Sequence, residues 1–138
     1  MIVHDTYVRV RYAETDQMGY VYYGKYAEYF EVGRVETIRS LGISYRTIEE
    51  KGILMPVADL QIKYKNPAFY DSLLRVRTTV PEIPRASFLT RYEIHDENEK
   101  LIVTGEVRLA FFDKSRMMPV RVPDFILAAV KNHWIESE

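Results

Sequence analysis

Asp16 carries the first group that could do chemistry, in the segment RYAETDQMGYVYYGKYAEYFEVGR, residues 11–34. A helix is expected to begin a few residues later, near Tyr23 or Gly24, and Gly24 has no side chain to accept the first N–H groups. A helix end with unpaired N–H donors carries roughly half a positive charge and stabilises an oxyanion. A carboxylate one short loop away could attack a carbonyl held there, or could activate water to attack it.

The absence of a nearby general acid limits which leaving group such a reaction could release. None of the three histidines, His4, His95 and His133, falls within the segment that contains Asp16. An amide or ester leaving group usually needs a proton, whereas a thiol with a pKa of about 8.5 can depart as a thiolate without a strong general acid. A carboxylate beside a helix terminus therefore suits a thioester. An aspartate in a loop can also simply cap the local turn, and the residues alone favour that simpler interpretation.

Other patterns in this region do not develop into sites. Gly19, Gly24 and the lysine that follows have the G-x-x-x-x-G-K spacing of a phosphate-binding loop, but Tyr26 stands where Ser or Thr is needed for magnesium. Glu14 and Asp16 are two residues apart in one loop, which is no sign of the separation that glycosidase carboxylates require. No G-x-S-x-G elbow occurs, and the scattered histidines give a metal site little support.

The composition favours one soluble domain over residues 1–138. The chain is 47% hydrophobic and can bury one sizeable core. With 19 basic and 20 acidic residues the net charge is -1, so no overall field attracts nucleic acid or an anionic membrane. There is no cysteine, which excludes disulfides and thiolate nucleophiles. The N-terminus lacks the apolar core of a signal peptide, and no segment reaches the roughly 18 to 20 apolar residues that cross a bilayer. We therefore expect a cytoplasmic protein without a nucleic-acid partner or membrane insertion.

The elements that must position Asp16 follow from periodicity. Alternation of apolar and polar residues predicts five strands, over residues 6–12, 56–66, 73–80, 86–95 and 101–113, with Gly105 as a candidate bulge. Helical spacing joins Tyr26, Tyr29, Phe30, Gly33, Thr37 and Leu41, and Gly42 follows as a stop. A short helical piece is expected near 44–51 and a last helix after Pro123. Strands that come in a run favour an antiparallel sheet of the α+β class.

Four segments of the chain resemble a known family. The first segment resembles the signature of the 4-hydroxybenzoyl-CoA thioesterase family of hotdog-fold acyl-CoA thioesterases, particularly the branch associated with the bacterial Tol-Pal cluster. The matching residues are Thr15-Asp16, Gly19, Val21-Tyr22, Tyr26 and Arg34. The segment YKNPAFYDSL, residues 64–73, is similar to the second landmark of that family, and SFLTRYEI and MMPVRVP are similar to its fourth strand and closing segment. The resemblance covers nearly the whole chain.

The resemblance implies a catalytic pair. Asp16 occupies the position of the catalytic carboxylate, which is a nucleophile or a general base in different members. The backbone N–H of Tyr23 corresponds to the donor that polarises the thioester carbonyl. The Tol-Pal branch commonly has a histidine where this chain has Tyr23, but the backbone donor survives that change.

The resemblance also implies substrate contacts. Gly19 fits the bend between the loop and the substrate, and Tyr22 and Tyr26 are candidate substrate-binding residues, although tyrosines near helix starts are more often packing residues. Arg85, with Ser87 close by, lies where relatives contact the phosphates of coenzyme A. The substrate would be an acyl-CoA, and no separate cofactor is implied because coenzyme A is part of the substrate.

The implied architecture is a hotdog fold, in which a curved antiparallel five-stranded sheet wraps around a long central helix and a further helix ends the chain. Protomers of this family join sheet edge to edge as homodimers, and tetramers that are dimers of dimers are frequent among them. Two other functions stay open. A hotdog hydratase would want a histidine beside the aspartate, and a non-catalytic acyl-CoA or acyl-carrier-protein binding protein would have the fold without turnover. The sequence does not identify the acyl group.

Overall fold

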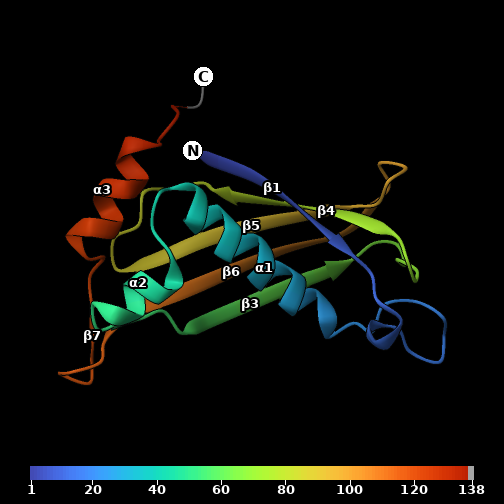
Figure 1. The fold of residues 1–138 in the computed structure, drawn as a ribbon, viewed down its shortest axis with the longest axis horizontal. Coiled ribbons are helices and arrows are strands. Elements are labelled where there is room, and N and C mark those ends of the chain that lie inside the picture. Colours follow the sequence, from blue (N-terminus) through green and yellow to red (C-terminus); the bar gives the residue numbers. More distant parts are fainter. Residues whose placement is uncertain (137–138) are drawn as a thin grey trace.

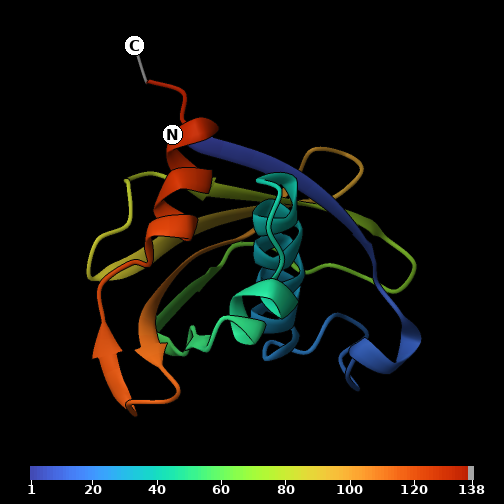
Figure 2. The ribbon, with the colours of Figure 1, turned by 60° about the vertical axis from the view of Figure 1, so that its left-hand side comes forward.

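The computed structural model describes residues 1–136 and contains a curled antiparallel sheet with a long helix in its hollow (Figure 1, Figure 2). Five long strands build the sheet in the spatial order β1, β4, β5, β6, β3. Their bounds are β1 Ile2–Arg9, β3 Val57–Tyr64, β4 Leu73–Val80, β5 Ser87–His95 and β6 Leu101–Asp113. Two short strands, β2 (Ile53–Leu54) and β7 (Met118–Val120), pair with the end of β6. The predicted α+β class and the five long strands are confirmed.

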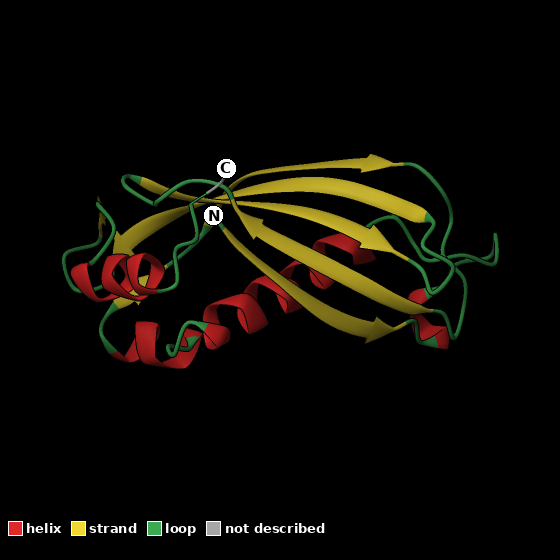
Figure 3. Ribbon diagram, turned by 90° about the horizontal axis from the view of Figure 1, so that it is seen from above, coloured by secondary structure: helices red, strands yellow, loops and turns green. Residues whose placement is uncertain are grey.

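Three helices accompany the sheet. The long helix is α1 (Lys25–Ser40), and α2 (Tyr45–Glu50) and α3 (Asp124–Asn132) are shorter. Figure 3 shows α1 lying under one face of the sheet along its length. Gly42 has a φ of 87° and its N–H donates to the carbonyl of Arg39, so it ends the long helix as expected. Within residues 1–136, no helix is both long enough and apolar enough to span a membrane.

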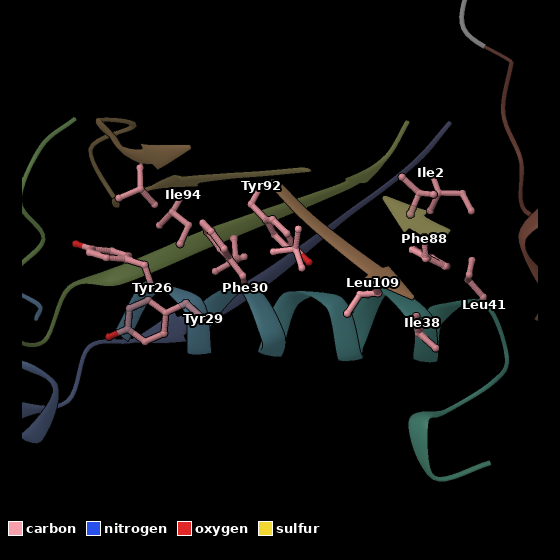
Figure 4. Packing of buried hydrophobic residues seen from close by; sticks show 14 of the residues in the cluster. Ile2, Tyr26, Tyr29, Phe30, Ile38, Leu41, Phe88, Tyr92, Ile94 and Leu109 are labelled. Carbon is pink, nitrogen blue, oxygen red and sulfur yellow. The ribbon is translucent and has the colours of Figure 1, made fainter. Parts of the chain in front are cut away.

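The core lies between α1 and the concave face of the sheet. Alternate residues of β4 point inward, and Leu74, Val76 and Val80 are fully buried. The helix contributes the predicted stripe, of which Phe30 stacks on Tyr92 of β5 with ring centroids 4.3 Å apart (Figure 4). On α3, Ile126, Ala129 and Val130 are buried and belong to the same core cluster. The aromatic residues of the stripe therefore fix α1 in the hollow.

Two sequence expectations are wrong in detail. The first strand spans Ile2–Arg9 rather than residues 6–12, because the chain turns at the 3₁₀-helix η1 (Tyr12–Glu14), which begins where Arg11 N–H donates to the Glu14 carboxylate. Gly105 is not a bulge, since the pairing of β6 with both neighbouring strands runs through it without a shift. A Cβ at Gly105 would overlap the Phe30 ring, so the glycine admits that ring to the sheet.

The edge strand β3 differs from the rest of the sheet. Most of its residues are exposed on both faces, including three large apolar ones: Val57 is 52% exposed, Leu60 42% and Tyr64 51%, whereas Ile62 is partly buried against the core. Among the residues that the structure describes, β3 pairs only with β6, so one row of its backbone groups is unpaired. Such an apolar, open edge is a template for pairing with another strand.

Candidate active site

A tight loop carries Asp16. One carboxylate oxygen of Asp16 accepts the N–H of Met18 at 2.8 Å. The backbone closes around it, because Gly19 N–H donates to the Asp16 carbonyl and Asp16 N–H donates to the Tyr20 carbonyl, both at 3.0 Å. Gly19 has a φ of 85°, in the left-handed region that favours glycine, which fits its predicted place at the bend. Asp16 therefore caps its own turn, and its second oxygen accepts no hydrogen bond within residues 1–136.

The entry to α1 leaves backbone donors unpaired. Tyr22 N–H donates to the Glu14 carbonyl and Lys25 N–H donates to the Tyr22 carbonyl, each at 2.9 Å. Between them, the N–H groups of Tyr23 and Gly24 have no acceptor among the described residues. Gly24 is the N-cap residue and provides no side-chain cap. The start of α1 therefore presents unsatisfied donors, as a helix end that receives an oxyanion would.

A cleft of about 550 Å³ brings these groups together. It joins the Asp16 loop, the entry of α1 and the end of β3, and it is lined by Asp16, Met18, Tyr20, Val21, Tyr22, Tyr23, Tyr26, Tyr64, Lys65, Asn66 and Pro67. Four of the predicted site residues, Asp16, Tyr22, Tyr23 and Tyr26, are thus neighbours in space. Gly19 shapes the loop without lining the cleft.

Tyrosine rings form much of the cleft wall. The ring centroids of Tyr22 and Tyr23 lie 4.5 Å apart, and the Tyr64 ring stands edge-on to those of Tyr23 and Tyr26. The Tyr64 hydroxyl donates to the carbonyl of Tyr23 at 3.1 Å, which ties β3 to the entry of α1. Tyr26 is 3% exposed, and burial raises the pKa of its phenol to about 12. The wall is apolar with a few hydroxyls, which suits an acyl group.

Arg85 and Ser87 lie elsewhere in the same chain. Ser87 begins β5 and its hydroxyl accepts from the Arg108 guanidinium at 2.7 Å. Arg85 precedes it and its carbonyl accepts the N–H of Val122. Figure 1 shows the start of β5 beside α3, at the opposite end of the sheet from the entry of α1. A single protomer therefore does not bring these two residues to the cleft.

Sequence reasoning missed several groups near the site. Glu14 is only 7% exposed, and its carboxylate accepts the hydroxyl of Tyr29 at 3.0 Å. Tyr64 and Lys65 line the cleft but belong to β3 and the residues after it. Tyr64 stands in the family landmark YKNPAFYDSL, which is a signal that could have identified it. No residue spacing indicates the contact between Glu14 and Tyr29, which only the fold creates. Among residues 1–136, no group of three or more histidine or acidic side chains could hold a metal ion.

The fold and this cleft define a hotdog-type protein with a site at the amino end of its central helix. A family model for the Thioesterase-like superfamily matches residues 10–130. YneP of Bacillus subtilis is 36% identical over 114 residues, which is 83% of each chain. The acyl-CoA thioesterase YbgC of Haemophilus influenzae is 35% identical over 123 residues, 88% of this chain and 90% of that protein. The DHNA-CoA thioesterase structure from Staphylococcus aureus is 38% identical with a TM-score of 0.86, covering 96% of this chain and 95% of that one.

The chain therefore belongs to the Thioesterase-like superfamily. The family resemblance, the hotdog fold and the thioester-hydrolase class predicted from the sequence are confirmed.

Proposed function

We propose that this protein hydrolyses an acyl-CoA thioester to a free acid and coenzyme A, with Asp16 as nucleophile or general base and the backbone N–H of Tyr23 as the donor to the carbonyl oxygen. The observation that carries the assignment is the cleft, which is lined by both Asp16 and Tyr23, the residue whose backbone N–H has no acceptor within residues 1–136. The YbgC relative is named an acyl-CoA thioesterase, and the Staphylococcus aureus relative acts on DHNA-CoA, which supports an acyl-CoA substrate.

Two routes fit this geometry. As a general base, Asp16 takes a proton from water while the oxygen of that water bonds to the thioester carbon. As a nucleophile, Asp16 bonds to that carbon itself and gives a mixed anhydride, which water then hydrolyses. In both routes the carbonyl oxygen becomes negative facing the N–H of Tyr23, and the carbon–sulfur bond breaks to release a thiolate. The thiolate needs no strong acid, and the reaction needs no cofactor beyond the coenzyme A of the substrate.

The open edge of β3 supports the homodimer that the family resemblance implies. An antiparallel pairing of two β3 strands would place the Val57 end of one beside the Tyr64 end of the other. Ser87 and Val57 pair with adjacent residues of β6, so the start of β5 lies near the Val57 end. The partner subunit's Arg85 and the partner subunit's Ser87 would then approach the cleft that Tyr64 lines, where they could contact the phosphates of coenzyme A.

A dimer would show twice the chain mass of 16.3 kDa in light scattering, and the family resemblance implies that a dimer of dimers could form from it. A cytoplasmic location stays a prediction from the sequence.

The test compares two aspartates that make the same kind of turn. Asp96 accepts the N–H of Asn98 at 2.9 Å, just as Asp16 accepts that of Met18 at 2.8 Å, but Asp96 lies in the hairpin between β5 and β6. Release of free thiol is measured with a panel of acyl-CoAs. We expect Asp16→Asn to lower kcat by about 10² to 10⁴-fold with an unchanged melting temperature, because the amide cannot act as base or nucleophile. Asp96→Asn should leave turnover unchanged.

Two other outcomes would contradict the proposal. Unchanged turnover in Asp16→Asn would remove Asp16 from the reaction and leave it as a turn cap. Binding of acyl-CoA by the unaltered protein without thiol release would support a non-catalytic binding protein instead.

A further inference from the structure

The buried carboxylate of Glu14 is the strongest feature that the proposed reaction leaves unexplained. Acidic side chains are almost never fully buried unless they are paired, and Glu14 is only 7% exposed. One oxygen of its carboxylate accepts the backbone N–H of Arg11 at 2.8 Å and the hydroxyl of Tyr29 at 3.0 Å. The other oxygen faces the Arg11 guanidinium at 3.4 Å, but that side chain is 76% exposed. Neutral donors from two elements therefore hold most of this carboxylate.

Glu14 also contacts the entry of α1 through its backbone. Its carbonyl accepts the N–H of Tyr22 at 2.9 Å, and Tyr23, the proposed carbonyl donor, is the next residue. In the other direction, Asp16 follows Glu14 by two residues, and Thr15 between them forms a bridge with Val21. Glu14 is thus the residue where the Asp16 loop and the entry of α1 are joined.

The partner of Glu14 lies on the rigid part of the molecule. Tyr29 is 2% exposed and belongs to the buried stripe of α1, and its ring stands edge-on to that of Tyr26 at 5.8 Å (Figure 4). Burial, and then the hydrogen bond to Glu14, raise the pKa of the Tyr29 phenol, so the phenol stays protonated as a donor. The bond therefore connects the Asp16 loop to a side chain that the core holds in place.

We propose that Glu14 is a positioning residue of the thioester hydrolysis, whose buried carboxylate, held by Tyr29, fixes Asp16 relative to the backbone donors at the entry of α1. The inference rests on the proposed function. Reaction rates fall steeply when a reacting group is displaced by about 1 Å, so a loop released from Tyr29 should slow the chemical step. Binding of coenzyme A involves other parts of the surface and should change little.

The test uses three substitutions and measures kcat and KM separately. Glu14→Ala removes the acceptor, and we expect kcat to fall about 10 to 100-fold with KM within about twofold. Glu14→Gln keeps an oxygen that can accept from Tyr29 and from Arg11, and it should recover most of the turnover that Glu14→Ala loses. Tyr29→Phe removes one hydroxyl from α1 and should lower kcat several-fold without changing KM.

A control separates positioning from folding. Tyr45→Phe removes a hydroxyl that accepts from Arg34 Nε at 2.9 Å, near the other end of α1, and should lower the melting temperature without changing kcat per folded molecule. All assays are run below the unfolding transition, with the folded fraction measured by circular dichroism. If Glu14→Ala does not fold, Tyr29→Phe alone decides the matter.

Two results would overturn the proposal. One is a kcat per folded molecule in Glu14→Ala and Tyr29→Phe equal to that of the unaltered protein. The other is a loss of turnover in Glu14→Gln as large as in Glu14→Ala. Either result together with inactive Asp16→Asn would reject only the role of Glu14, whereas active Asp16→Asn would reject the proposed site itself.

Discussion

The two ends of α1 differ in whether the chain itself provides hydrogen-bond partners for their backbone groups. At the carboxyl end, Leu41 N–H donates to the Ile38 carbonyl and Gly42 N–H donates to the Arg39 carbonyl, so the chain itself pairs two of the last carbonyls of the helix. At the amino end, no side chain caps Gly24, and its N–H has no acceptor among the described residues. One end is closed by the chain itself, and the other is open toward a cleft.

Buried charges show the same contrast. Arg34, in the carboxyl half, is 7% exposed, and its guanidinium donates to the hydroxyls of Tyr45 at 2.9 Å and Tyr92 at 3.2 Å. Thr90 completes that network at 2.7 Å from the Tyr92 hydroxyl, and none of its residues lines the cleft that contains Asp16. Glu14, at the amino end, also accepts a hydrogen bond from a buried tyrosine, Tyr29, but it precedes Asp16 by only two residues. The helix therefore separates a half that stabilises the fold from an end that is available to a ligand.

The largest effect on stability should come from removing one hydroxyl of the network around Arg34. Tyr92→Phe removes one of the two hydroxyl acceptors of Arg34 and leaves a buried donor of a charged group unsatisfied, while the ring can still stack on Phe30. We expect the free energy of unfolding to fall by about 2 kcal/mol, with turnover per folded molecule unchanged. Urea denaturation and thiol release on the same samples measure both quantities.

An exposed tyrosine provides the control for this change. Tyr7 is 61% exposed on β1, and Tyr7→Phe should leave both stability and turnover unaltered. A loss of turnover in Tyr92→Phe at full folding would show that the two regions of α1 are coupled, and the contrast drawn between them would fail.

The free energy of unfolding should depend on pH through the buried phenol of Tyr26, near the amino end of α1. Burial raises the pKa of the Tyr26 phenol from the ordinary 10.0 to about 12 in the folded chain. Its contribution to stability is therefore fully present below about pH 10 and is lost as the pH rises through about 12, because the unfolded chain ionises first. We expect the difference in unfolding free energy between the unaltered protein and Tyr26→Phe to decline across that window. Urea denaturation at several alkaline pH values measures it, and a constant difference would contradict the buried phenol.

Much of the fold was predictable because its signals are local. Alternation along the long strands and the helical stripe of α1 are properties of neighbouring residues, and they predict the sheet and its helix. Strands β2 and β7 have two and three residues and show no period, so they were not predicted. Gly105 was interpreted as a bulge because its real reason, the Phe30 ring, lies 75 residues away in the chain.

The candidate site likewise contains residues that a local motif predicts and residues that only the fold brings together. Asp16, Tyr22, Tyr23 and Tyr26 are close in sequence and meet in the cleft, so one motif was enough to find them. Lys65 joins them only because β3 ends beside α1, and no local pattern indicates that meeting. Arg85 and Ser87 stay predictions, since their role depends on a second copy of the chain that one sequence does not position.

The smallest effect on stability should come from closing the open end. Gly24 has φ and ψ of -71° and -17°, which is helical rather than the extended geometry of a good cap. Gly24→Ser should therefore change the free energy of unfolding by roughly a few tenths of a kcal/mol, because glycine is itself an acceptable cap. Its Cβ would lie 2.9 Å from the Tyr22 ring, which lines the cleft and must shift. We expect kcat/KM to fall several-fold.

Gly42→Ala is the matched change at the other end of α1. With a φ of 87°, that position strains any residue with a Cβ, so stability should fall by about 1 kcal/mol while turnover per folded molecule stays constant. Denaturation and kcat/KM measured on both variants give a crossed pattern if the amino end binds the substrate and the carboxyl end only stabilises the helix. If Gly24→Ser instead keeps full kcat/KM, the position of the Tyr22 ring, which the new Cβ displaces, does not matter for the substrate.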